Sequence, residues 1–175
     1  MVNKDINTNV DAMVDLYLPL VSRTAFRILC DRKDCEAVSW SVLNYLIDNP
    51  FPCDLSVSKI EMKLYHITVV YSIQRIIRRQ FMWIFYNRPP VYTYSLAENR
   101  TSEDFIKGQV WEIYCRASRN MTPLQRVVYA LMELEQLPVT DVAKITGLMP
   151  FLVTAALDNS REKVKKELRR YGRVL

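Results

Sequence analysis

The stretch that decides the fold is residues 121–157, MTPLQRVVYALMELEQLPVTDVAKITGLMPFLVTAAL. Thr122-Pro123 is typical of a helix cap followed by the first helical position, and it opens a predicted helix to about residue 134. A short helix over Val139–Thr146, a turn at Gly147 and a longer helix over Pro150–Tyr171 follow, because glycine often ends a helix in the left-handed conformation. This order is the helix-turn-helix pattern. An αα-hairpin with no role in DNA binding is the alternative interpretation.

The chain before this stretch also has helical patterning. Apolar residues recur at helical spacing over residues 10–29 and 35–47, and Asp34 is placed to cap the second helix. A third helix is predicted over Val57–Tyr86. Its predicted polar face holds Thr68, Ser72, Arg75 and Arg79, and its predicted apolar face holds Val69, Ile73, Ile76 and Ile77.

Composition places the chain among all-α proteins. Half of its 175 residues are hydrophobic, which is enough to bury a core, and only three are glycine, which favours helices over a β fold with many turns. Asn87-Arg-Pro-Pro90 begins a segment with little helical periodicity, since paired prolines stop helices. We therefore predict two separately packed helical domains, residues 1–88 and 105–175, joined by a linker over residues 89–104. A helix over residues 105–118 opens the second domain.

Positive charge gathers in two separate places. Residues 62–97 contain five basic residues and no acid, and residues 161–175 contain seven basic residues and two acids. The rest of the chain is mildly acidic. Two basic clusters favour contact with a polyanion such as nucleic acid, although ordinary solvated helix faces would have the same composition.

The sequence contains no pattern for catalysis, for a metal or for a cofactor. The four cysteines form no Cys-x-x-Cys pair, the three glycines form no phosphate-binding loop, and the single histidine, His66, has no evident catalytic partner. The cysteines are expected to be reduced and mostly buried. The N-terminus is polar and no apolar run approaches the roughly 20 residues that span a bilayer, so we expect a cytoplasmic protein without membrane insertion.

Residues 121–148 closely resemble the C-terminal DNA-binding domain of extracytoplasmic-function sigma factors, the sigma-70-type subunits of bacterial RNA polymerase. That family has a Pro-x-Gln-Arg start, an apolar helix ending in Glu-x-x-x-Leu, and an Ile/Val-Ala-x-x-x-Gly helix-turn-helix. Residues 17–20, 25–29, 31–36 and 64–79 resemble the family's other domain, in the same order along the chain. The residues that fall in register in the C-terminal part are Pro123, Gln125, Arg126, Glu133, Leu137, Val142, Ala143, Gly147, Val153 and Leu157.

The resemblance implies a non-enzymatic transcription initiation factor that binds core RNA polymerase and directs it to promoter DNA. An anti-sigma factor is a further candidate partner. The residues implied to contact the −10 promoter element are Tyr71, Gln74, Arg75, Arg78 and Arg79. Those implied to bind polymerase are Trp40, Leu43, Asn44 and Ile47. Those of the recognition helix and tail, implied to contact the −35 element, are Leu152, Thr154, Ala155, Asp158, Asn159, Arg161, Lys163, Lys165 and Lys166.

The sequence departs from the family at each of these surfaces. Residues 37–41, Ala-Val-Ser-Trp-Ser, replace an acidic, glutamine-bearing stretch, and Gln74 replaces an aspartate. Usually basic positions of the recognition helix hold Thr154, Ala156, Asp158 and Asn159, and an acid there repels phosphate. Two other functions therefore stay open. One is a helix-turn-helix regulator that binds duplex DNA without polymerase, and the other is a sigma-like interaction protein that no longer reads DNA.

An aromatic run, Phe81-Met-Trp-Ile-Phe-Tyr86, follows the arginines of the third predicted helix. Aromatic side chains beside arginines can stack on unpaired bases. We favour the alternative, in which Phe81, Trp83 and Phe85 close the core of the first domain.

Overall fold

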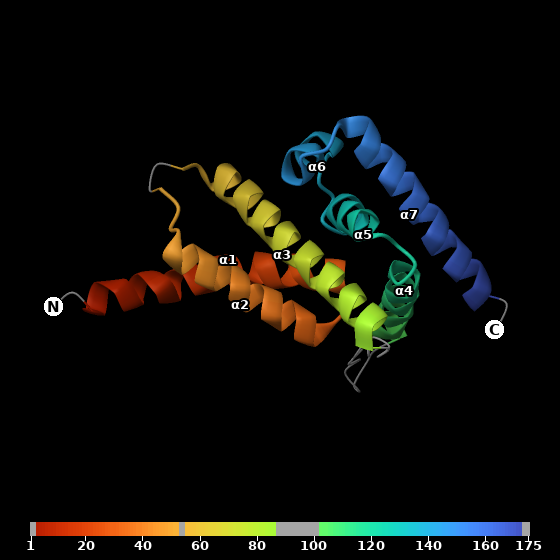
Figure 1. Ribbon diagram of the computed structural model, residues 1–175, viewed down its shortest axis with the longest axis horizontal. Helices are drawn as coiled ribbons and strands as arrows, with labels where there is room; N and C mark the ends of the chain where they lie inside the picture. The colour runs from red at the N-terminus through yellow and green to blue at the C-terminus, as the bar shows by residue number, and fades with distance from the viewer. Residues whose placement is uncertain (1–2, 53–54, 87–101, 173–175) are drawn as a thin grey trace.

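The computed structural model describes residues 3–52, 55–86 and 102–172, and the regular secondary structure within them is entirely helical. No strand occurs in these three segments, which confirms the all-α prediction. Figure 1 shows the arrangement of the helices. In chain order they are α1 (Asn3–Leu29), α2 (Arg32–Asp48), α3 (Val57–Tyr86), α4 (Ser102–Ser118), α5 (Pro123–Tyr129), the π-helical turn η1 (Ala130–Leu134), α6 (Val139–Thr146) and α7 (Pro150–Tyr171).

The first half of the protein is a bundle of α1, α2 and α3, which pack against one another around their apolar stripes. The cap of α2 is Asp31 rather than the predicted Asp34. The Asp31 side chain accepts a hydrogen bond from the backbone N–H of Asp34 at 3.0 Å. As a result α2 begins three residues earlier than predicted, and the Asp34 carboxylate is available for contacts with another helix.

The second half contains the predicted helix-turn-helix. Thr122 and Gln125 cap α5 reciprocally, each accepting a hydrogen bond on its side chain from the other's backbone N–H. α6 ends at Gly147, whose φ of 71° lies in the left-handed region that strains any larger residue. Pro150 opens α7, which packs on α4, α5 and α6. The bounds of α6 and α7 agree with those predicted, whereas the helix predicted before them ends in the π-helical turn η1.

The two halves share one core. α3 packs on α5 and α6, α1 packs on α5 and η1, and a single buried apolar cluster includes residues of both halves. The described parts of the two halves therefore pack against each other rather than separately. The predicted linker over residues 89–104 lies largely outside the described residues, so the domain boundaries stay a prediction.

A buried carboxylate next to η1 joins the halves. The side chain of Glu135 is 3% exposed and forms ion pairs with Arg23 and Arg27 of α1, at 3.1 and 2.9 Å. The hydroxyl groups of Thr24 and Tyr65 donate to the same carboxylate at 3.3 and 3.4 Å. One acidic side chain of the second half thus binds donors from both α1 and α3.

A second contact between the halves lies where α1 ends. Cys30 is buried there beside Tyr114 and Cys115 of α4. The hydroxyl of Tyr114 donates to a backbone carbonyl of α1 at 2.7 Å, and that of Ser118 donates to the sulfur of Cys30 at 3.5 Å. The three cysteines in the described residues are free and buried, as predicted.

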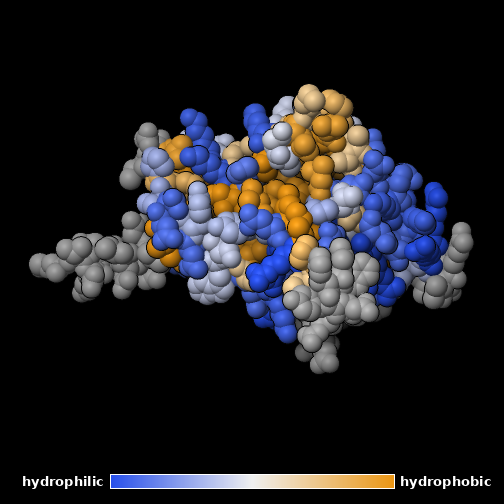
Figure 2. Space-filling model, in the orientation of Figure 1, coloured by the Kyte–Doolittle hydropathy of each residue, from blue (hydrophilic) through white to orange (hydrophobic). Residues whose placement is uncertain are grey.

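The faces of α3 differ from those predicted. Thr68 and Ser72, assigned to the polar face, are fully buried, and their hydroxyl groups have no hydrogen-bond partner among the described residues. Ile77, assigned to the apolar face, is half exposed. The reason is that α3 is covered on two sides, by the other helices of its bundle and by the second half. Figure 2 shows apolar residues at the surface along the middle of α3.

No single helix in the described part of the chain is long and apolar enough to cross a bilayer. α6 and α7 reach that length and composition only when they are taken together, and the chain bends by 102° between them. α6 and the start of α7 also contribute buried side chains to the shared core.

Candidate nucleic-acid interface

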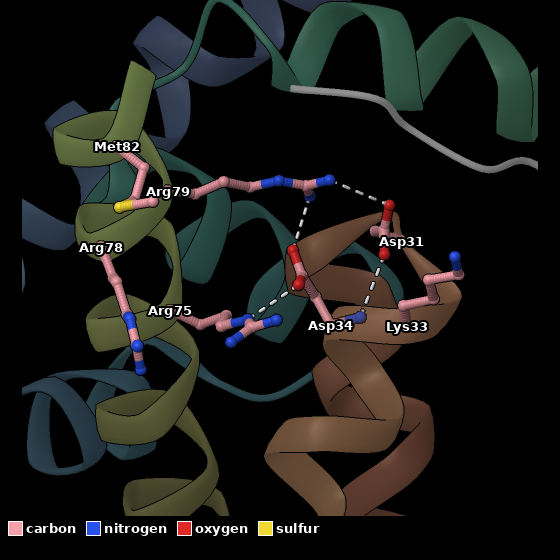
Figure 3. Close-up of a pocket in the computed structure, with 7 residues that line it drawn as sticks. All are labelled: Asp31, Lys33, Asp34, Arg75, Arg78, Arg79 and Met82. Atoms are coloured by element: carbon pink, nitrogen blue, oxygen red, sulfur yellow. Dashed lines mark hydrogen bonds and ion pairs between the residues drawn. The ribbon is translucent and has the colours of Figure 1, made fainter. Parts of the chain in front are cut away.

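Two of the three arginines assigned to the −10 element are bound within the protein. The Arg75 guanidinium donates to the Asp34 carboxylate at 2.7 Å. Arg79 donates to Asp34 at 2.5 Å and to Asp31 at 3.2 Å. Figure 3 shows both arginines reaching from α3 across to the N-terminal end of α2. The two carboxylates are almost completely buried, so these arginines fasten α3 to α2.

The other residues assigned to the −10 element face solvent. Gln74 and Arg78 are exposed and Tyr71 is partly exposed. They line a groove of about 250 Å³ between α2 and α3, and Arg78 also borders a neighbouring cavity of about 400 Å³ together with Lys33. In Figure 3 the Arg78 side chain points away from the two carboxylates. Arg78 forms no ion pair with any residue of the described segments, so its charge is available to a ligand.

The outer face of α7 offers few free hydrogen-bond donors. Leu152, Thr154, Ala155, Asp158 and Asn159 are all exposed, as their assignment to a recognition helix requires. The hydroxyl of Thr154, however, donates to the Pro150 carbonyl at 3.1 Å, and the side-chain amide of Asn159 donates to the Ala155 carbonyl at 2.9 Å. Both polar side chains are therefore bound to their own helix backbone, one turn back.

The basic end of α7 is also partly bound within the protein. Arg161 donates to Glu133 of η1 at 2.9 Å, and the Lys163 ammonium donates to the Asn120 carbonyl at 2.6 Å. Lys165 pairs with Glu162 on the same helix at 2.8 Å. Lys166 is exposed and has no ion pair in the described part of the chain. Of the four basic residues assigned to this cluster, Lys166 is thus the one that can bind a phosphate without first giving up a contact within the described part of the protein.

The residues assigned to polymerase binding separate into two groups. Trp40 is 65% exposed and shares one face of α2 with Asn44 and Ile47, both also exposed. Leu43 is only 3% exposed and belongs to the core, so its side chain is not accessible to a partner in this conformation. The sequence missed Tyr45, which is exposed on the same helix. Helical spacing predicts which residues of α2 share a face. It does not predict which of those residues a neighbouring helix covers.

Several exposed apolar residues were not expected from the sequence. Phe81 is more than half exposed, so its assignment to the core is wrong, while the side chains of Trp83 and Phe85 lie outside the described residues. Met149 and Phe151, where α6 leads into α7, are exposed as well. The signal that could have found them is their position just after Gly147, on the outer side of the helix-turn-helix.

Within the described residues, no three histidine, cysteine or acidic side chains lie close enough together to hold a metal ion. The imidazole Nδ1 of His66 lies 2.7 Å from the backbone carbonyl oxygen of Ile145, which ties α3 to the last turn of α6. The lone histidine therefore has a packing contact between the two halves.

No protein-family model matches the sequence, and no curated protein matches it. Solved structures do match. One of them is the co-crystal structure of the sigma factor RpoE with the anti-sigma factor NepR from Bartonella quintana, with a TM-score of 0.66 and 12% sequence identity. The match covers 92% of this chain and 97% of that chain, so it includes both halves. At this identity the likeness is one of fold, and this chain has the all-α fold of a sigma factor.

Proposed function

We propose that this protein is a sigma-like transcription factor that binds core RNA polymerase and directs it to promoter DNA. The observation that carries the proposal is the sigma-factor fold over nearly the whole chain, with a helix-turn-helix in its second half. In this role α7 enters the major groove of duplex DNA, and the groove beside Tyr71, Gln74 and Arg78 receives the −10 element. The chemistry of transcription belongs to the polymerase, and the protein acts in the cytoplasm without a cofactor or enzymatic activity of its own.

A second candidate is a sigma-like interaction protein. Five of the seven basic residues assigned to DNA are bound to groups of the protein itself, namely Arg75, Arg79, Arg161, Lys163 and Lys165. The structural neighbour described above is bound to an anti-sigma factor, which supports a protein partner of that kind here. A helix-turn-helix regulator that acts without polymerase is the third candidate. Capture of core RNA polymerase by the full chain separates the first candidate from the other two.

Replacing Trp40 by alanine should weaken polymerase binding by about 2 kcal/mol, or roughly 30-fold, the size of an interface hot spot. Its indole is the largest exposed apolar group assigned to that surface, so its removal leaves the core intact. Binding is measured by titrating labelled protein with core RNA polymerase, and folding by circular dichroism.

The matched control is Leu168→Ala, which shortens an exposed apolar side chain on α7, away from α2. It should leave polymerase affinity within twofold of the unmodified chain. Equal loss from both variants, or no loss from Trp40→Ala, would show that α2 is not the polymerase contact.

Replacing Arg78 or Lys166 by glutamine should lower the affinity for DNA and flatten its dependence on salt. Each phosphate contact contributes a slope of about 0.9 in log affinity against log salt on duplex DNA and about 0.7 on single strands. Both side chains are exposed and have no ion pair in the described segments, so each should remove about one contact. Titration of labelled DNA at several salt concentrations, with polymerase present, measures the slope.

Arg75→Gln is the control for this experiment. Its guanidinium is bound to Asp34, so the substitution should lower stability and leave the salt slope of the folded protein unchanged. A slope that falls for Arg75→Gln and not for Arg78→Gln would mean that the ion pair opens in the complex and that Arg78 is not the contact.

A further inference from the structure

The first turn of α7 exposes apolar side chains where a DNA-reading helix normally presents polar ones. Phe151 is 63% exposed, and Met149 and Leu152 beside it are also exposed. Ala155, one turn further, faces solvent as well. Figure 2 shows this apolar surface at the top of the molecule, where α6 leads into α7. We call Phe151, Leu152 and Ala155 the apolar reading face.

The side chains of this part of α7 offer few free groups that could form hydrogen bonds with base edges. Adenine is read by a bidentate asparagine or glutamine and guanine by a bidentate arginine or lysine. The side chains of Thr154 and Asn159 each donate a hydrogen bond to the backbone of their own helix. The Asp158 carboxylate can only accept hydrogen bonds, and it lies 3.7 Å from the Arg161 guanidinium. No arginine or lysine lies between residues 145 and 160.

One feature of the major groove suits apolar side chains, and it is the C5-methyl group of thymine. We propose that the apolar reading face recognises thymine methyl groups, so that α7 selects A·T base pairs by apolar contact. This inference rests on the proposed function, in which α7 enters a major groove. The N-terminal residues of a recognition helix are those that contact base edges, and Phe151 and Leu152 occupy the first turn of α7.

The spacing of these residues fits neighbouring base pairs. Phe151 and Ala155 are four residues apart, or about 6 Å along the helix axis at 1.5 Å per residue. Base pairs of a duplex follow one another at about 3.4 Å. A thymine within two base pairs of another would therefore place both methyl groups within reach of the same helix face.

Charge favours DNA over a protein as the occupant of this face. The same helix continues to Tyr171, and its residues 161–171 carry six basic residues and two acids. Lys166 lies on this stretch, exposed and without an ion pair in the described segments. The first turn of α7 is apolar and the later turns are basic. This order matches a major groove, where thymine methyl groups line the floor and phosphates border it.

The test begins with the full chain in the presence of core RNA polymerase and a pool of random 30-base-pair duplexes, from which bound DNA is enriched. The enriched duplex is then made twice, once with thymine and once with deoxyuridine, which lacks only the methyl group. We expect the deoxyuridine duplex to bind about fourfold more weakly for each methyl group contacted, the effect of about 0.8 kcal/mol per buried carbon. Phe151→Ser and Leu152→Ser should bind the two duplexes more equally, and Leu168→Ser should keep the full difference.

Each other outcome overturns a different statement. If no duplex is enriched or bound, DNA binding itself fails, and with it both the proposed function and this inference. If the enriched duplex binds equally well with thymine and deoxyuridine, the inference fails while the proposed function stands. If Phe151→Ser weakens capture of core RNA polymerase and leaves both duplex affinities unchanged, the face belongs to a protein partner and the inference is wrong.

Discussion

Replacing Asp34 by alanine should destabilise the fold by about 3 kcal/mol, near the lower end of the range for breaking a buried ion pair. The Asp34 side chain is 7% exposed and accepts hydrogen bonds from both Arg75 and Arg79. Its loss leaves two guanidinium groups beside a single remaining acid, Asp31. The value is at the lower end because Arg75, with 37% of its side chain exposed, can turn toward water. Urea unfolding followed by circular dichroism measures the change.

The control is Glu36→Ala in the same turn of α2. Glu36 pairs with Arg32 at 3.0 Å, but both side chains are more than half exposed, so the loss should stay below about 0.5 kcal/mol. Equal losses from the two variants would mean that the buried pair adds no net stability. Arg75 and Arg79 would then again be candidates for DNA contact.

The helix boundaries could be predicted from the sequence because they depend on local chemistry. The ends of α6 and α7 follow from Gly147, which supplies the left-handed cap, and from Pro150, which suits the first helical position. The capping box at Thr122 is equally local. The sequence alone places the cap of α2 three residues too late, because Asp31 and Asp34 both suit that position and only the hydrogen bond from the Asp34 N–H distinguishes them.

The candidate site could not be predicted as well, because it depends on contacts between residues far apart in the chain. Arg75 and Arg78 look alike in the sequence, yet Arg75 meets a carboxylate 41 residues away and Arg78 meets solvent. Leu43 and Trp40 are both apolar residues of one helix, and only the packing of α1 and α3 decides which of them is buried. Periodicity places residues on a face, but it does not identify what covers that face.

The shared core has a consequence for promoter binding. The −10 and −35 elements lie roughly 25 base pairs apart, which is about 85 Å at 3.4 Å per base pair. A compact chain of this length has a radius of gyration of only about 16 Å. With both halves on one core, the protein is too small to contact both elements at once. If the proposed function is right, the halves must therefore separate when polymerase and promoter are bound.

The contacts of Glu135 are the strongest polar link that would have to break, so Glu135→Gln should favour separation of the halves. The substitution removes the charge that pairs with Arg23 and Arg27 and keeps the shape of the side chain. Hydrogen bonds to a charged group contribute about 1.5–3 kcal/mol each. Arg23 is half exposed and can rehydrate, so we expect a total loss of about 2–3 kcal/mol. By the factor of ten per 1.4 kcal/mol, the separated state should become about 30- to 150-fold more populated.

Buried thiols report this change site by site. Cys30 and Cys115 lie at the contact between α1 and α4, whereas Cys35 lies inside the first half, where its sulfur donates to the Ser22 carbonyl. Hydrogen bonding with Cys30, together with burial, raises the pKa of Cys115, and burial raises the pKa of Cys35, so neither should react while it is covered. In Glu135→Gln, alkylation of Cys30 and Cys115, followed by mass spectrometry, should accelerate about 30- to 150-fold, the same factor as the separated state.

Two comparisons make this prediction decisive. Glu133→Gln changes an acid of η1 that pairs with Arg161 inside the second half, so it should leave all three thiols as slow as in the unmodified protein. Cys35 distinguishes separation from unfolding within one sample, because separated halves leave it inside its own bundle. If Cys35 accelerates together with Cys30 and Cys115, the variant unfolds as a whole and Glu135 stabilises the entire fold. If none of the three accelerates, the halves are held together by their apolar contact, and the carboxylate is not what keeps them closed.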